Sequence, residues 1–158
     1  MDNLNTEILN NVIMRYKSTP PTTTSSPKQP IDKVRDFLDS DLEEKGYFDA
    51  QSNSEYSNLQ KKINELKAQG KLLCDSAIEN YEDENSEIKS NINGISSTGQ
   101  LEVIEKLKAQ IEKNQRGIKG VEEIKKTDLP NDNMPVYASY RRGFEKWRRA
   151  IAEKLLTN

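Results

Sequence analysis

Apolar residues recur at alternating intervals of three and four over the middle of the chain, the spacing of a helix with one apolar seam. One run covers residues 56–95 and a second covers residues 104–121. Between them, a stop signal at Gly94 is followed by a new capping box that begins at Ser97. The pattern therefore predicts an all-α protein built on a long antiparallel helical hairpin or coiled coil over residues 52–126.

The apolar seams supply the candidate assembly residues. Asn114 falls on the second seam, where a buried amide is costly unless it is paired and where polar residues fix register and oligomer state. Exposure of Asn114 near a frayed helix end is the alternative. The seams close either within one chain or between copies. The predicted assembly residues are Leu59, Ile63, Leu66, Leu73, Ile104, Leu107, Ile111, Asn114 and Ile118.

Glycines interrupt both heptad runs. A continuous first helix of about 40 residues would extend for roughly 60 Å. Gly70 lies on its seam, so a bend or break at this point is the competing prediction. In the second run, Gly117 and Gly120 each disfavour helix by about 1 kcal/mol relative to Ala. We therefore expect the second helix to loosen after Gln115.

Two segments of different character precede the hairpin at the N-terminus. Residues 1–17 carry an apolar stripe of Leu4, Ile8 and Val12, which predicts an amphipathic helix that either docks on the rest of the chain or folds on a partner. A helix of this length is marginal on its own in water. Residues 18–30 are rich in Pro, Ser and Thr, a composition typical of an extended, flexible linker. The first helix is thus expected to be tethered to the remainder of the chain.

An acidic segment lies between the linker and the hairpin. Residues 31–48 combine a short apolar stripe with many carboxylates, and Gly46 is expected to end the helix. The segment lacks the glycine and terminal glutamate of an EF-hand loop. It is therefore interpreted as one short helix with a solvated acidic face.

The last predicted helix, residues 136–158, follows a loop at residues 127–135. Its apolar face consists of Tyr140, Phe144, Trp147, Ile151 and Leu155. Aromatic stripes at helical spacing are often core, so this face can close the hairpin as a third helix. It can also bind a groove of a partner protein or an anionic membrane, with Phe144 and Trp147 as anchors.

The same helix is basic on its other side. Six Arg and Lys against two Glu give residues 136–158 a net charge of +4, while the remaining chain carries −6. Arg142, Lys146 and Arg149 gather on one face and form a candidate phosphate-binding cluster. The overall net charge of −2 argues against a dedicated nucleic-acid-binding protein.

The amino-acid composition limits the kinds of core and functional site that the chain can form. The apolar content is 33% and the charged content 32%, which favours extended helices with narrow seams over one large core. The sequence has no His and a single cysteine, Cys74, which excludes His bases, His metal ligands and internal disulfides. Cys74 is interpreted as a small apolar filler. Since no catalytic or phosphate-cradling motif occurs, we expect no enzyme activity, no cofactor and no metal.

These patterns favour a non-enzymatic helical adaptor or scaffold subunit. Its expected partners are proteins, including further copies of itself as a homo-oligomer. No signal peptide or transmembrane segment is found in the sequence, which predicts a soluble intracellular protein of the cytoplasm or nucleus. The alternative is a nucleic-acid-associated accessory factor of a polymerase or packaging machinery that uses the basic C-terminal helix.

Overall fold

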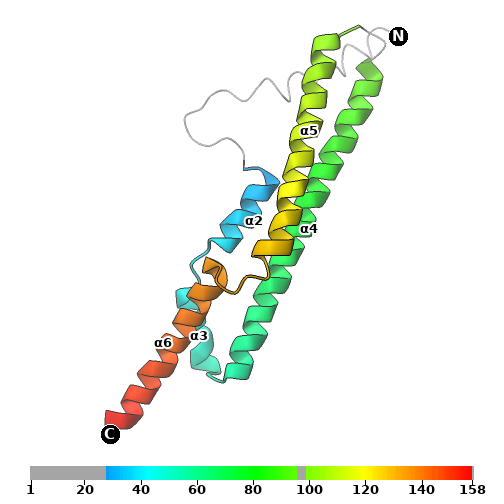
Figure 1. Cartoon of the computed structure of the whole chain (residues 1–158). Helices are drawn as coiled ribbons and strands as arrows, with labels where there is room; N and C mark the ends of the chain where they lie inside the picture. Colours follow the sequence, from blue (N-terminus) through cyan, green and yellow to red (C-terminus); the bar gives the residue numbers. More distant parts are fainter. Residues whose placement is uncertain (1–27, 96–98, 158) are drawn as a thin grey trace.

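The computed structural model describes residues 28–95 and 99–157, and the described residues form helices and no strand (Figure 1). The all-α prediction is confirmed. The predicted N-terminal helix, with Leu4, Ile8 and Val12, lies outside the described residues. The described elements are α2 (Pro30–Leu38), α3 (Glu43–Ser52), α4 (Tyr56–Ile95), α5 (Leu101–Glu123), the π-helical turn η2 (Ile124–Asp128) and α6 (Pro135–Thr157).

The predicted helical hairpin is present. Helix α4 is one continuous helix of 40 residues, and α5 returns antiparallel along its C-terminal half (Figure 1). The helix does not break at Gly70, so the predicted break was wrong. The glycine is buried where the side chains of Leu129 and Phe37 pack directly over it, and a methyl group at Gly70 would overlap both. The gap left by the missing side chain is filled from other elements.

Helix α5 also stays intact where loosening was expected. It continues past Gln115 to Glu123 and then passes directly into η2, so the predicted loosening was wrong. The reason is again tertiary packing. The Tyr81 ring lies against Gly117, where a larger residue would overlap it, and the tip of the Ile31 side chain lies against Gly120.

The acidic segment forms two helices instead of one. Helix α2 ends at Leu38, and α3 begins at Glu43. In the segment that connects them, the Leu42 amide donates a hydrogen bond to Ser139 Oγ of α6 at 2.8 Å. Gly46 lies inside α3 and does not end a helix, so that prediction was wrong. Its role is in packing against α6.

Buried apolar residues form two clusters. The larger cluster joins α2, α3, α6 and η2 to the N-terminal half of α4 and the end of α5. The smaller one closes the far end of the hairpin and consists of Ile88, Ile95, Ile104 and Leu107, with partly buried neighbours. Full burial of such a side chain contributes about 1.5–3 kcal/mol, so the larger cluster supplies most of the stability. Cys74 is fully buried in it, which confirms its interpretation as an apolar filler.

Three tyrosines are buried in the larger cluster. The Tyr137 hydroxyl donates to the Leu129 carbonyl oxygen at 2.8 Å, and the Tyr140 hydroxyl donates to Asp49 Oδ2 at 2.6 Å. Burial raises the pKa of Tyr137 to about 12. Burial, with the nearby Asp49 carboxylate, also raises the pKa of Tyr140, and burial raises the pKa of Tyr81. All three therefore favour the protonated form in the folded state.

We expect alkaline pH to destabilise the fold. Each of these tyrosines has a higher pKa in the folded state than in the unfolded state. Its contribution to the stability of the fold is therefore intact below the unfolded pKa of about 10 and is lost as the pH rises through the folded pKa. The urea concentration at the midpoint of unfolding should decrease as the pH is raised from 9 to 11. This decrease should be smaller in the Tyr137→Phe protein. Absorbance at 295 nm should show part of the tyrosine titration only on unfolding. A single titration step near pH 10 in the native protein would contradict this assignment.

Candidate protein-interaction surface

Helices α3 and α6 touch through glycines. A methyl group at Gly46 would overlap the carbonyl oxygen of Tyr140, and one at Gly143 would overlap the carbonyl oxygen of Glu43. Since these clashes are with backbone atoms, rotation of a side chain cannot relieve them. Each glycine thus permits direct backbone contact, which brings the side chains on the flanks of the two helices together.

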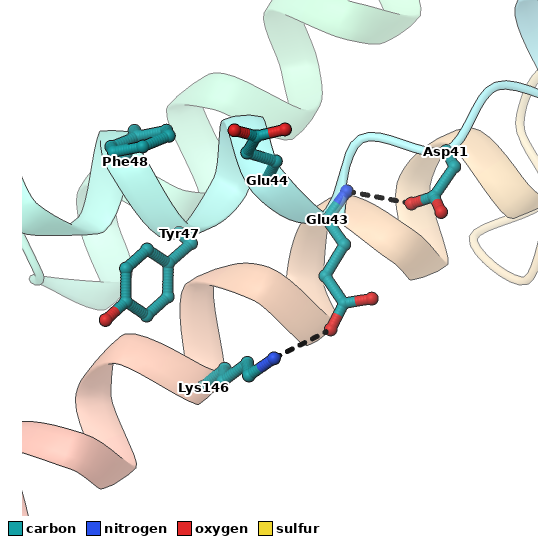
Figure 2. Close-up of a pocket in the computed structure, with 6 residues that line it drawn as sticks. All are labelled: Asp41, Glu43, Glu44, Tyr47, Phe48 and Lys146. Carbon is teal, nitrogen blue, oxygen red and sulfur yellow. Dashed lines mark hydrogen bonds and ion pairs between the residues drawn. The ribbon is translucent and has the colours of Figure 1, made fainter.

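An aromatic cluster forms beside this contact. The Tyr47 ring meets the Trp147 ring edge-on with centroids 5.5 Å apart, and the Phe48 ring lies 6.1 Å from Tyr47 in a similar geometry. Figure 2 shows Tyr47 directed toward α6 and Phe48 directed away from it. Phe48 is 54% exposed, whereas Trp147 is partly buried against the core. We call Tyr47, Phe48 and Trp147 the aromatic cluster.

A shallow surface hollow adjoins the aromatic cluster. Its volume is about 530 Å³, and it is open to solvent. Figure 2 shows that carboxylates occupy much of its lining. The residues that line it are Asp41, Glu43, Glu44, Tyr47, Phe48 and Lys146.

The apolar stripe of α6 is covered over only part of its length. Tyr140 and Phe144 are fully buried, Trp147 and Ile151 are partly buried, and Leu155 is 76% exposed. These residues lie three or four apart and therefore share one helix face. Figure 1 shows why burial stops, because α6 extends past α3 and past the start of α4. We call residues 151–157 the uncovered end of α6.

Two of the three predicted phosphate-binding residues pair with a carboxylate of the same chain. Arg142 Nε donates to Glu43 Oε2 at 3.3 Å, and Lys146 Nζ lies 3.8 Å from Glu43 Oε1. Arg149 is exposed, and no ion pair involves it among residues 28–95 and 99–157. The side chains of Arg142 and Lys146 are still 59% and 69% exposed, so the basic face meets both solvent and one acidic side chain of α3.

Other cations fix the position of α6. The Arg148 guanidinium lies over the Tyr56 ring, 3.8 Å from its centroid, and donates to the Ser54 carbonyl oxygen. Arg141 forms an ion pair with Asp132 at 3.3 Å, in the loop that precedes α6. These contacts hold α6 at the junction of α3 and α4, and the last turns of α6 are exposed with respect to the other described residues.

The side chains of the predicted seam residues pack against other parts of the same chain. Leu59, Ile63 and Leu66 are buried in the larger cluster, where α4 meets elements other than α5. Ile104 and Leu107 are buried at the far end of the hairpin. The partly buried seam residues are Leu73, Ile111 and Ile118. Little of the heptad seam is thus left for contact with another molecule.

Asn114 is fully buried and paired. Its Nδ2 donates to Asn85 Oδ1 at 2.9 Å across the hairpin, and its Oδ1 accepts from Gln110 Nε2 at 3.0 Å. The alternative of exposure at a frayed end was wrong. Since the amides must face each other to be satisfied, the pair favours one alignment of α4 and α5.

The predicted partner anchors separate into different environments. Phe144 is fully buried inside the chain and cannot meet a partner, so that assignment was wrong. Trp147 is partly buried, with its ring at the aromatic cluster. Phe48 was noted in the sequence only as an apolar residue beyond a helix, and its exposure depends on how α3 packs. Leu155 belonged to the predicted stripe, but spacing alone could not show that it is uncovered.

Within the described part of the chain, no helix combines the length and apolar character needed to span a bilayer. The same residues bring together no group of three or more metal-ligating side chains. Comparison with protein families, with curated proteins and with solved structures finds no match to this chain.

Proposed function

We propose that this protein is a non-enzymatic helical adaptor or scaffold subunit that acts through protein–protein interaction. The observation that supports this most strongly is the apolar stripe of α6, which is core as far as Phe144 and uncovered at Leu155. The aromatic cluster adjoins it, with Phe48 half exposed. Exposed apolar surface next to aromatic residues and a charged rim is typical of protein-binding sites.

The hairpin would act as a spacer in such an adaptor. A helix of 40 residues has a length of about 60 Å, and its apolar seam is used internally. The proposed interaction surface lies near one end of α4, and the start of α5 lies near the other (Figure 1). This arrangement suits a protein that holds a partner at a defined distance from a second contact.

Electrostatics weigh against the nucleic-acid alternative. Glu43 pairs with both Arg142 and Lys146, which reduces the positive charge that they offer to phosphate. Asp41 and Glu44 lie in the same hollow and would repel a phosphate backbone. We therefore propose the protein-binding function alone.

Site-specific photocrosslinking tests this proposal. A benzophenone side chain at Leu155 should give discrete protein adducts in cells, while one at Leu72 should not. Leu72 is a matched control because it is a helical leucine that is 70% exposed, on α4. Absence of any protein adduct at Leu155, including one with the chain itself, would contradict the proposal. Salt-sensitive oligonucleotide binding that is lost on changing Arg142, Lys146 and Arg149 to Ala would replace it with the alternative.

A further inference from the structure

We propose that residues 1–17 form an amphipathic helix that docks on the rest of its own chain, in line with α2, along the far half of the hairpin (residues 82–95 and 101–114). The sequence predicts this helix from its apolar stripe and leaves open whether it meets its own chain or a partner. The segment itself lies outside the described residues. Three features of the described surface favour its own chain, and this surface is separate from the one at the end of α6.

Helix α2 shows how a third helix packs across both helices of the hairpin. The Ile31 amide donates to the Tyr81 hydroxyl at 3.4 Å, and the Phe37 ring lies against Gly70. The neighbours of α2 on α4 therefore run backwards, from Tyr81 at its start to Gly70 near its end. The start of α2 thus points toward the far half of the hairpin, where α4 and α5 continue side by side (Figure 1). We call the flank of the hairpin that α2 covers the α2 side.

The first feature is that the hairpin is buried more deeply on the α2 side than on its opposite flank. At the level of α2, Tyr81 of α4 and Val121 of α5 are buried. Ile78 and Ile118, which belong to the other row of each seam, are only partly buried. Because Tyr81 bonds to α2, the cover that α2 provides accounts for this difference.

The same difference continues beyond α2. Ile88 lies seven residues after Tyr81 and is fully buried, whereas Ile92 in the other row of α4 is only partly buried. On α5, Leu107 is buried and Ile111 is only partly buried. Both rows of a seam between two helices insert into the partner helix, so the pairing of α4 with α5 alone does not favour one row. The deeper burial on the α2 side favours a further helix on this flank.

The second feature is the reach of the tether. Residues 18–27 connect the segment to the start of α2 beside Tyr81, and ten residues span at most roughly 30–35 Å. Ile95 lies 14 residues beyond Tyr81, or about 21 Å along α4. Tyr56 lies 25 residues away in the other direction, or about 38 Å, and α6 extends past that end (Figure 1). The tether therefore favours the far half of the hairpin over the uncovered end of α6.

Tethering also strengthens docking on the same chain. A short flexible linker holds a segment at a local concentration in about the millimolar range. A contact that would be weak between separate molecules is therefore well populated within one chain.

The third feature is charge. Gly70 lies against α2, and Glu84 lies two heptads after it on the same face of α4. Glu84 is partly buried, and Glu87 follows about one turn later. The α2 side is thus acidic just beyond the start of α2.

The segment carries a cation where this acidic region requires one. Because its C-terminal end is joined to α2, a helix docked in line with α2 runs toward it and brings Arg15 to the level of Glu84. On a right-handed helix that runs in this direction, Arg15 borders the apolar stripe on the edge that faces α4. Opposite charges at this level favour docking in this direction.

Hydrogen exchange of the full chain, measured by mass spectrometry, tests the docking. Ile8→Asp places a charge in the apolar stripe of the segment, so exchange in residues 88–95 and 101–110 should become at least about tenfold faster. Asn10→Asp is the matched control, because it adds the same charge two residues away on the polar side of the segment. This control should leave exchange in both regions unchanged.

Charge reversal locates the contact. Arg15→Glu alone and Glu84→Lys alone should each speed exchange in the far half of the hairpin by about two- to fivefold. The chain with both changes should recover most of the protection, since opposite charges again face each other. The exchange rates should not depend on protein concentration, because the segment and the hairpin belong to one chain.

Three results would overturn the docking. Exchange in the Ile8→Asp chain could be the same as in the natural chain, or the double charge reversal could fail to restore protection. Protection that increases with protein concentration would show that the segment docks on a second copy instead. None of these results alters the adducts expected at Leu155, so the docking and the proposed function can fail separately.

Discussion

Replacing Gly143 by alanine should destabilise the protein severely, by about 3 kcal/mol or more, the upper range for overpacking in a core. The new methyl group would overlap the Glu43 carbonyl oxygen and crowd the Tyr47 amide, both of which are backbone groups. Helices α3 and α6 would have to separate, which would expose part of the larger cluster. Urea denaturation followed by circular dichroism measures the loss.

Gly120→Ala is the matched control for this change. It is also a glycine inside a helix, but the added methyl group would meet only the tip of the Ile31 side chain, which can rotate away. The gain in helix propensity, about 1 kcal/mol, should offset most of the remaining strain. We therefore expect the stability of Gly120→Ala to be close to that of the natural chain. A Gly143→Ala protein as stable as the Gly120→Ala protein would mean that α3 and α6 do not touch at these glycines.

Replacing Asn114 by alanine should cost about 1–3 kcal/mol, because it leaves the buried Asn85 amide without its donor. The two side chains lie 2.9 Å apart at a buried position of the hairpin. Removing both amides should cost less than the sum of the single changes, since neither buried amide of the pair is left without the other, and the partly buried Gln110 amide, which also bonds to Asn114, can bond to water instead. A double-mutant cycle with Asn85→Leu and Asn114→Leu, measured by urea denaturation, gives the coupling energy.

The leucine pair should also relax the alignment of the hairpin. Leucines on both helices accept several alignments, whereas two facing amides are satisfied in one. Hydrogen exchange at the far end of the hairpin, around Ile95 and Ile104, should therefore become faster in the double variant even if its global stability is retained. Additive single effects, with no coupling energy, would show that Asn85 and Asn114 are not paired.

The hairpin could be predicted from the sequence because its signal is local. Seam residues such as Ile88 and Leu107 recur at intervals that only a helix places on one face. The position of Asn114 on that seam likewise indicated that it needs a partner. The spacing did not identify that partner as Asn85, because both alignment and closure within one chain depend on the turn between the helices.

The glycines could not be interpreted correctly from local sequence. In isolation, Gly46 is a helix stop and Gly70 and Gly117 are weak points, because glycine disfavours helix. In the folded chain each lies where another element packs closely, with α6 at Gly46, Leu129 and Phe37 at Gly70, and Tyr81 at Gly117. These contacts join residues distant in sequence. Local helix propensity therefore predicted that the glycines weaken their helices, whereas in the folded chain they permit close packing.

Only part of the candidate site could be predicted from the sequence, because the burial and pairing of its residues depend on contacts with distant parts of the chain. The stripe that contains Phe144 and Leu155 was evident, but which part is covered depends on where α3 and α4 end. The basic face of α6 was also evident, yet its pairing with Glu43 joins residues 99 positions apart for Arg142. Spacing on one helix shows which residues share a face and does not show what that face meets.

The heptad seams close inside a single chain. This closure can be tested by pulsed electron paramagnetic resonance with spin labels on Lys89→Cys of α4 and Lys108→Cys of α5. Both positions are exposed, and the buried Cys74 resists labelling. Packed helix axes lie about 8–10 Å apart, so the labels should report a short distance. Closure within one chain predicts that this distance persists when labelled protein is diluted into a large excess of unlabelled protein under conditions that allow exchange. Loss of the short distance on dilution would contradict closure within one chain, because it would show that the paired helices belong to different chains.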